Sequence, residues 1–176
     1  RSVSGEVSEL RQKMLEETDA DWIFILDGDE IWHKQIIKNL ISNIKSTKYD
    51  VIVSPNYLLV GDMYHFLEEK AGKYKIGNRI GNYNIRAIRK TSGLSVQGTY
   101  PNEAYVASHR VKVQDLPNEK VLFLDDKYLH MSFLSRSSKD RKKTKFEIGE
   151  SLPLDFYYPE VFFKLRPDII SQPWRP

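Results

Sequence analysis

Three carboxylates follow an apolar run early in the chain, and their types and spacing suit the binding of a cation. The run 22–26 ends at Asp27, Asp29 and Glu30, with Gly28 between the two aspartates. Two aspartates one residue apart can turn to the same side and share a hard cation through oxygen ligands. The alternative is a strand that ends in a polar turn. Several acidic groups crowded at one strand end favour the functional interpretation.

The elements around these carboxylates predict how they are positioned. The apolar run is typical of a buried strand. A helix is expected before it at about 4–17, a second helix at 33–45, and a strand at 49–54 that ends at Pro55. This α-β-α-β order predicts an α/β fold with a mostly parallel central sheet and helical crossovers. In such open sheets, ligands bind at the carboxyl ends of the strands.

After Pro55 the pattern becomes irregular and predicts a mixed second half. Short strands are expected at 57–60, 84–89, 104–107, 111–113, 121–124 and 128–133. A basic helix is expected at 135–148, and an aromatic, proline-rich tail follows at 151–176. We therefore expect one domain over residues 1–150 and a separate C-terminal tail.

The composition fits a globular protein and excludes several classes. The chain has 176 residues, of which 40% are hydrophobic and 29% charged, which suits one domain with a single core. The net charge of +3 is too small to indicate a nucleic-acid partner. No apolar run approaches the roughly 20 residues that a membrane helix needs. The absence of cysteine excludes disulfides and thiolate zinc sites, and it fits a cytoplasmic protein.

Four segments resemble motifs of the family 2 glycosyltransferases, which have the GT-A fold. WIFILDGDE is similar to that family's tryptophan-hydrophobic-LDADE signature, and IRAIRK resembles an arginine-bearing strand of the family. GTYPNEAY keeps the family's glycine and glutamate but has Asn102 where the family often has histidine. YLHMSF resembles an aromatic strand that carries a histidine. The resemblance covers about residues 5–150.

This resemblance implies a GT-A-like, Rossmann-like domain with an irregular acceptor-side half. It implies a metal-dependent transferase that moves a sugar from a nucleotide-sugar donor to a glycan, lipid-linked or protein acceptor, with inversion at the anomeric carbon. The implied cofactor is Mn²⁺ or Mg²⁺, which would neutralise the leaving diphosphate. The family's opening strands, which hold the nucleotide base, would precede Arg1. The chain is therefore expected to be an incomplete domain.

Roles in that chemistry can be assigned to four residues. Asp29 is expected to be a direct metal ligand, and Asp27 to reach the ribose, or the metal through water. His130 is either a further metal ligand or a packed strand histidine. Glu103 lies at the family's glutamate position, where a general base would take the proton of the acceptor hydroxyl. An exposed loop glutamate is the alternative at this position.

Three arginines are candidates for binding the donor diphosphate. Arg11 lies in the helix before the signature, where the family also has an arginine. Arg86 and Arg89 are three residues apart on one predicted strand, so they face opposite sides of it. At most one of these two is therefore expected to point into the site, where its guanidinium could bind phosphate oxygens.

Other segments have more than one interpretation. The basic stretch 136–145 could cover the diphosphate, contact anionic lipid on the inner face of the membrane, or form a solvated helix face. Trp32, Tyr100 and Tyr105 are candidates for stacking on an acceptor sugar.

Two rival functions fit parts of the sequence. ILDGDEI is close to the nucleophile motif of haloacid-dehalogenase-like phosphatases, with Asp27 as nucleophile and Asp29 as general acid, and VLFLDD resembles the late acidic pair of that family. Residues 55–120, however, show no clear amphipathic helix of the kind that family's fold repeats between these motifs. A non-catalytic fragment that binds sugar or a partner is the second alternative.

Overall fold

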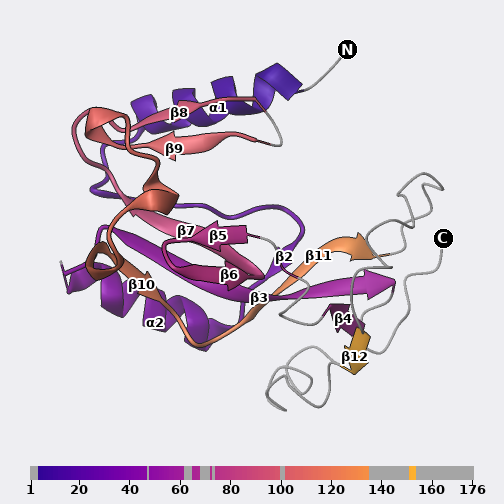
Figure 1. The fold of residues 1–176 in the computed structure, drawn as a ribbon. Helices are drawn as coiled ribbons and strands as arrows, with labels where there is room; N and C mark the ends of the chain where they lie inside the picture. The colour runs from indigo at the N-terminus through magenta and orange to yellow at the C-terminus, as the bar shows by residue number, and fades with distance from the viewer. Residues whose placement is uncertain are drawn as a thin grey trace.

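The computed structural model describes residues 4–46, 48–61, 65–67, 72, 74–99, 102–134 and 151–153 (Figure 1). Within these ranges the chain forms two α-helices, an eight-stranded sheet and two small two-stranded sheets. The α-helices are α1 (Ser4–Glu17) and α2 (Lys34–Lys45), close to the helices that the sequence predicts. Neither of these helices is long and apolar enough to span a membrane.

The large sheet is mixed in direction. Its strands are β1 (Trp22–Phe24), β2 (Glu30–Ile31), β3 (Val51–Gly61), β4 (His65–Leu67), β7 (Tyr83–Arg89), β10 (Val121–Phe123), β11 (Tyr128–Leu134) and β12 (Ser151–Pro153). They follow the order β1–β7–β3–β11–β2, with β10 and β4 also paired to β3 and β12 paired to β4. β10 and β11 run parallel to β3, whereas β1–β7, β7–β3 and β2–β11 are antiparallel. The α/β class is as predicted, but the expected predominance of parallel pairing was wrong.

The reason lies in the position of β7. β1 and β3 both run antiparallel to β7, so they point the same way and are joined through α2 by a crossover connection. β7 comes later in the chain and lies between them. Periodicity along a sequence indicates the type of each element, but it does not indicate which strands become neighbours.

β3 also continues through Pro55, where the sequence predicted its end. Before Pro55 its parallel neighbour is β10, with Val53 opposite Phe123. From Asn56 onward the neighbour is β11, beginning with Asn56 opposite Tyr128. Proline lacks the N–H group that a continuous ladder needs. It is tolerated here because the strand changes parallel partner at this residue.

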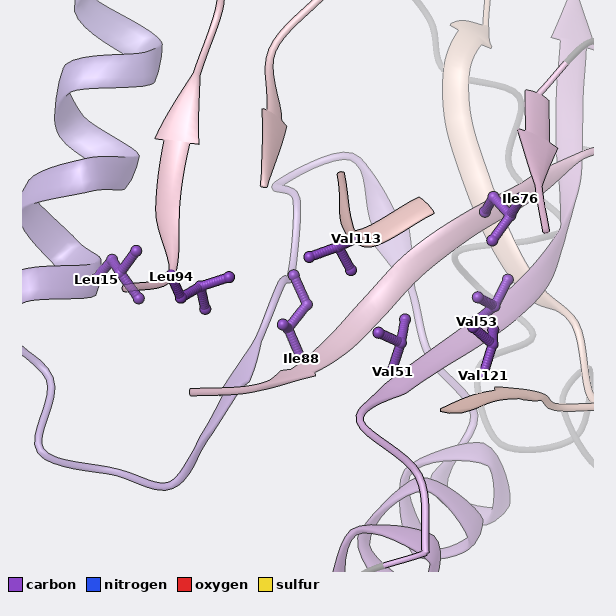
Figure 2. Close-up of a cluster of buried hydrophobic side chains, with 8 residues drawn as sticks. All are labelled: Leu15, Val51, Val53, Ile76, Ile88, Leu94, Val113 and Val121. Carbon is purple, nitrogen blue, oxygen red and sulfur yellow. The ribbon is translucent and has the colours of Figure 1, made fainter. Parts of the chain in front are cut away.

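Alternate residues of β3 pack into apolar clusters on opposite faces of the sheet. Ile52 packs with Ile36 and Leu40, so α2 covers one face. Val51 and Val53 belong to the cluster on the other face, which Figure 2 shows. The remaining buried members of that cluster are Leu15, Ile76, Ile88, Leu94, Val113 and Val121. Because Leu15 belongs to α1, this second cluster ties α1 to the sheet.

Short elements cover this second face. They are the pairs β5 (Tyr74–Ile76) with β6 (Arg79–Gly81) and β8 (Ser95–Gln97) with β9 (Ala104–Val106), and the 3₁₀ helices η2 (Ser108–Arg110), η3 (Val113–Asp115) and η4 (Asn118–Lys120). The strand expected at 111–113 was wrong: Lys112 makes a single bridge to Val106 and η3 follows. α1 lies against β8 (Figure 1), where the Gln12 side chain accepts a hydrogen bond from the Val96 amide at 2.7 Å.

Two predicted segments fall largely outside the described residues. The basic helix expected at 135–148 lies entirely outside them, and so does the basic stretch 136–145. Of the tail, 151–153 is described, and it forms β12 against β4.

Candidate functional site

Asp27 and Asp29 lie in the connection between β1 and β2, and Gly28 and Asp29 form a turn there. Their side chains have different partners: Asp27 faces two arginines, and Asp29 accepts a hydrogen bond from Ser132. Residues two apart share a side in a strand, but this alternation does not hold in a turn. The two carboxylates that the sequence placed together therefore have different partners in the structure.

Asp27 is joined to Glu103 through Arg11. The Arg11 guanidinium on α1 lies 3.5 Å from Asp27 Oδ1 and donates a 2.7 Å hydrogen bond to Glu103 Oε1. The Glu103 side chain is 8% exposed, and its Oε2 atom has no hydrogen-bond partner among the described residues. One oxygen of this carboxylate is therefore held by a cation, while the other is buried without a hydrogen-bond partner among the described residues.

The loop before β9 explains how Glu103 reaches this position. Gly98, just after β8, has φ of 87°, in the left-handed region that favours glycine. A Cβ atom there would lie 2.8 Å from the Asn102 carbonyl oxygen and 3.4 Å from Glu103 Cα. The glycine therefore allows the loop to close on itself immediately before the glutamate.

On the other side of Asp27 stands Arg86 of β7. Its Nη1 atom lies 3.1 Å from Asp27 Oδ2, and its Nη2 atom forms an ion pair with Glu30. The guanidinium also donates to the Tyr128 hydroxyl from Nε at 3.1 Å. The Arg86 side chain is 3% exposed and that of Glu30 is fully buried. Glu103, Arg11, Asp27, Arg86 and Glu30 thus form a chain of alternating charge, which we call the charge chain.

Burial and hydrogen bonding make the Glu30 end of this chain rigid. Burial raises the pKa of Glu30, against the opposing effect of Arg86. Glu30 Oε2 accepts a 3.0 Å hydrogen bond from Trp32 Nε1. The Trp32 ring in turn stacks on Tyr128, with ring centroids 4.4 Å apart and planes 6° from parallel. Burial also raises the pKa of Tyr128, so its phenol stays neutral beside Arg86.

Asp29 belongs to a second group, built on β11. Asp29 Oδ1 lies 3.7 Å from His130 Nε2, and the Ser132 hydroxyl donates to Asp29 Oδ2 at 2.8 Å. The Ser132 oxygen is also 2.7 Å from His130 Nε2. A serine hydroxyl has one hydrogen, so the second contact requires the histidine tautomer that carries hydrogen on Nε2. Two residues expected in a metal site, Asp29 and His130, therefore lie together.

The other predicted residues have various positions. Arg89 is the last residue of β7, three positions after Arg86. It pairs with Asp50 at 3.1 Å and takes no part in the charge chain. Trp32 is half-buried, and its stacking on Tyr128 occupies one ring face. Tyr105 lies beside the charge chain: burial raises its pKa, Arg11 opposes this, and Asp27 and Glu103 reinforce it. Tyr100 lies outside the described residues.

Sequence reasoning did not assign a definite role to Glu30 and did not select Tyr128 or Ser132. A usable signal existed for the last two. Tyr128, His130 and Ser132 alternate along one predicted strand, so they share a side of it with the selected histidine. No signal separated Glu30 from an exposed carboxylate, because its burial depends on β2 pairing with β11.

Comparison with known proteins adds no relative. No protein-family model matches the chain, and no curated protein matches it.

Proposed function

We propose that this chain carries the metal and acceptor sites of a metal-dependent inverting glycosyltransferase that moves a sugar from a nucleotide-sugar donor to a glycan, lipid-linked or protein acceptor. One observation carries the proposal. Arg11, Asp27, Arg86 and Glu103 were selected from separate motifs, yet they lie in one charge chain in which Arg11 and Glu103 are 92 positions apart. A set of unrelated surface charges would not be expected to converge in this way.

Glu103 is suited to act as the general base. Its Oε1 atom is held by Arg11, and Oε2 has no partner among the described residues, so Oε2 is the atom that would receive a proton. In the proposed step the acceptor oxygen forms a bond to the anomeric carbon while its proton passes to Glu103. The bond from that carbon to the diphosphate oxygen breaks, and its electron pair leaves with the diphosphate.

The residues near Asp29 fit a divalent cation. A carboxylate and an imidazole nitrogen, 3.7 Å apart, are donors that Mn²⁺ accepts. When bound, such a cation supplies the positive charge that stabilises the leaving diphosphate. Within the described residues, no three or more His, Cys, Asp or Glu side chains are grouped so that they can hold a metal ion.

Arg86 and Arg11 would hold Asp27 in place. Both guanidinium groups contact the Asp27 carboxylate, which is 39% exposed and therefore accessible to a ligand. An oriented carboxylate can accept hydrogen bonds from a ribose hydroxyl, which is the role that the resemblance implies.

Titration with Mn²⁺ and a panel of nucleotide sugars tests this function. The wild-type chain is expected to bind one of the donors in the presence of Mn²⁺, and Asp29→Ala is expected to lose that binding. Asp21→Ala is the matched control, because Asp21 is exposed and lies just before β1, at the opposite end of the strand from Asp29. If neither metal nor any nucleotide sugar binds the wild type, the transferase proposal fails and a non-catalytic role is favoured.

The phosphatase alternative can be tested directly. A nucleophile at Asp27 should form an adduct with beryllium fluoride, whereas an Asp27 that accepts hydrogen bonds should not. The sheet order does not favour this alternative, because β7 and β3 lie between β1 and β10, the strand followed by the late acidic pair. Asp27 is also engaged by two arginines.

A further inference from the structure

Ser132 completes a group of three donors with Asp29 and His130. Ser132 Oγ lies 2.7 Å from His130 Nε2 and 2.8 Å from Asp29 Oδ2, and His130 Nε2 lies 3.7 Å from the other carboxylate oxygen, Asp29 Oδ1. We propose that these three side chains are the direct ligands of a divalent cation such as Mn²⁺, and that Asp27 is not one. This inference rests on the proposed function only for the presence of a cation in the site.

The distances from Ser132 Oγ to its two neighbours are close to those between adjacent ligands of an octahedral cation. Metal–oxygen distances of about 2.1 Å place neighbouring ligands of an octahedral cation about 3 Å apart. The three observed separations bracket this value. A cation placed among these donors would replace the hydrogen bonds that now join them, with little movement of the side chains.

The backbone holds these donors firmly. His130 lies opposite Glu30 in the pairing of β11 with β2, and the Met131 amide donates a 2.8 Å hydrogen bond to the Asp29 carbonyl oxygen. Residues 130 and 132 are two apart on a strand and so project to one side. The pairing of β11 with β3 is irregular between His130 and Phe133. Such irregularities often re-aim a side chain at a functional site.

Asp27 is unsuited to be a ligand because of its own partners. Its two carboxylate oxygens face Arg11 at 3.5 Å and Arg86 at 3.1 Å. A divalent cation bound to Asp27 would lie close to two guanidinium charges and would be repelled by both. The group at Asp29 instead offers a neutral hydroxyl and an imidazole beside its carboxylate.

Mn²⁺ binding to the full chain without nucleotide tests the ligand set, with the loss of the free Mn²⁺ electron paramagnetic resonance signal as the readout. Asp29→Asn, His130→Ala and Ser132→Ala are each expected to weaken Mn²⁺ binding at least about tenfold, the range seen when partners in a metal site are removed. Asp27→Asn is expected to bind within about twofold of the wild type. Ser92→Ala, in an exposed turn, is the serine control and is expected to bind normally.

A change of metal preference distinguishes a ligand from a structural hydroxyl. Ser132→Cys is expected to bind Cd²⁺ more tightly and Mn²⁺ more weakly than the wild type, because a thiolate prefers soft metals. A serine that only supports the fold would not produce this reversal. Thermal unfolding of each variant without metal shows whether weaker binding follows from loss of folding.

The two proposals fail on different results. If Ser132→Ala and Ser132→Cys bind both metals as the wild type does, or if Asp27→Asn loses as much Mn²⁺ affinity as Asp29→Asn, the ligand set is wrong. A wild type that binds no Mn²⁺ also overturns it. If Mn²⁺ binds through these three side chains but no nucleotide sugar binds, the transferase proposal fails while the metal site stands.

Discussion

Replacement of Arg86 by methionine should reveal how strongly the charge chain holds the fold. The substitution keeps a long, flexible apolar side chain and removes the cation that faces Glu30 and Asp27. The Glu30 carboxylate would then be buried with no cationic partner, retaining the hydrogen bonds from Trp32 and the Asp27 amide. Its pKa, already raised by burial, would lose the opposing effect of Arg86 and rise further.

The expected loss of stability follows from the burial of the pair. The Arg86 and Glu30 side chains are 3% and 0% exposed. Removing one partner of a buried pair costs about 3–5 kcal/mol, because it leaves an uncompensated charge. Arg89, three residues along the same strand, pairs with Asp50, and these side chains are 26% and 29% exposed. A partly exposed pair of this kind contributes about 0–1 kcal/mol.

Urea denaturation at pH 7, followed by tryptophan fluorescence and circular dichroism, measures these differences. Arg86→Met is expected to lower the free energy of unfolding by at least about 2 kcal/mol more than Arg89→Met does. Adding Glu30→Gln to Arg86→Met is expected to restore part of that loss, since the carboxylate is no longer charged. Equal free energies of unfolding for the two arginine variants, or no recovery of stability on adding Glu30→Gln, would show that the buried pair does not stabilise the fold in this way.

Three further variants test other parts of the site. Burial raises the pKa of Glu30, so the folded state favours the protonated form of this carboxyl. The resulting stabilisation is fully present below pH 4.5 and is lost as pH rises through the folded-state pKa. Urea denaturation across this window should show the wild type losing stability relative to Glu30→Gln as pH rises. Gly98→Ala should destabilise the chain more than Gly93→Ala in thermal unfolding, because both have positive φ but only the first would press a Cβ atom against Asn102. Glu103→Gln keeps an oxygen that can accept from Arg11 but removes the base. The kcat of sugar transfer, measured with a donor found by titration, should fall about 10²–10⁴-fold with little change in donor affinity. An equal loss of donor affinity would contradict the role of base.

The elements of the fold were largely predictable, but their pairing was not. Helical spacing of apolar residues was sufficient to predict α2 at nearly its observed bounds. The strand prediction at 84–89 corresponds to β7, which spans Tyr83–Arg89. The insertion of β7 between β1 and β3 depends on contacts between distant segments, which local patterns do not encode. The same is true of β3, which passes through Pro55 because β11 replaces β10 as its neighbour.

For the residues of the site, too, local patterns predicted some features, and others depended on how the chain folds. Strand alternation predicted that Arg86 and Arg89 face opposite sides, but the pairing of β7 with β3 is irregular at Arg86, so that basis does not hold there. Arg86 lies over the Tyr128 ring and pairs with Asp27, whereas Arg89 lies over the Trp22 ring and pairs with Asp50. For Asp27 and Asp29, one-residue spacing suggested a shared cation. That inference depended on strand geometry continuing past residue 26, and the turn at Gly28 removes the basis for it.

The turn gives the two aspartates separate tasks. Asp27 is fixed by Arg11 and Arg86, so its position depends on α1 and β7. Asp29 is fixed by β11 through Ser132 and the Met131 amide, so its position depends on a strand on the other side of β3 from β7. A cation at Asp29 would therefore have different protein partners from the arginines on Asp27. Because Gly28 joins the two groups through two peptide bonds, the proposed metal and Arg11, the more exposed of the two arginines, could contact one diphosphate from different sides.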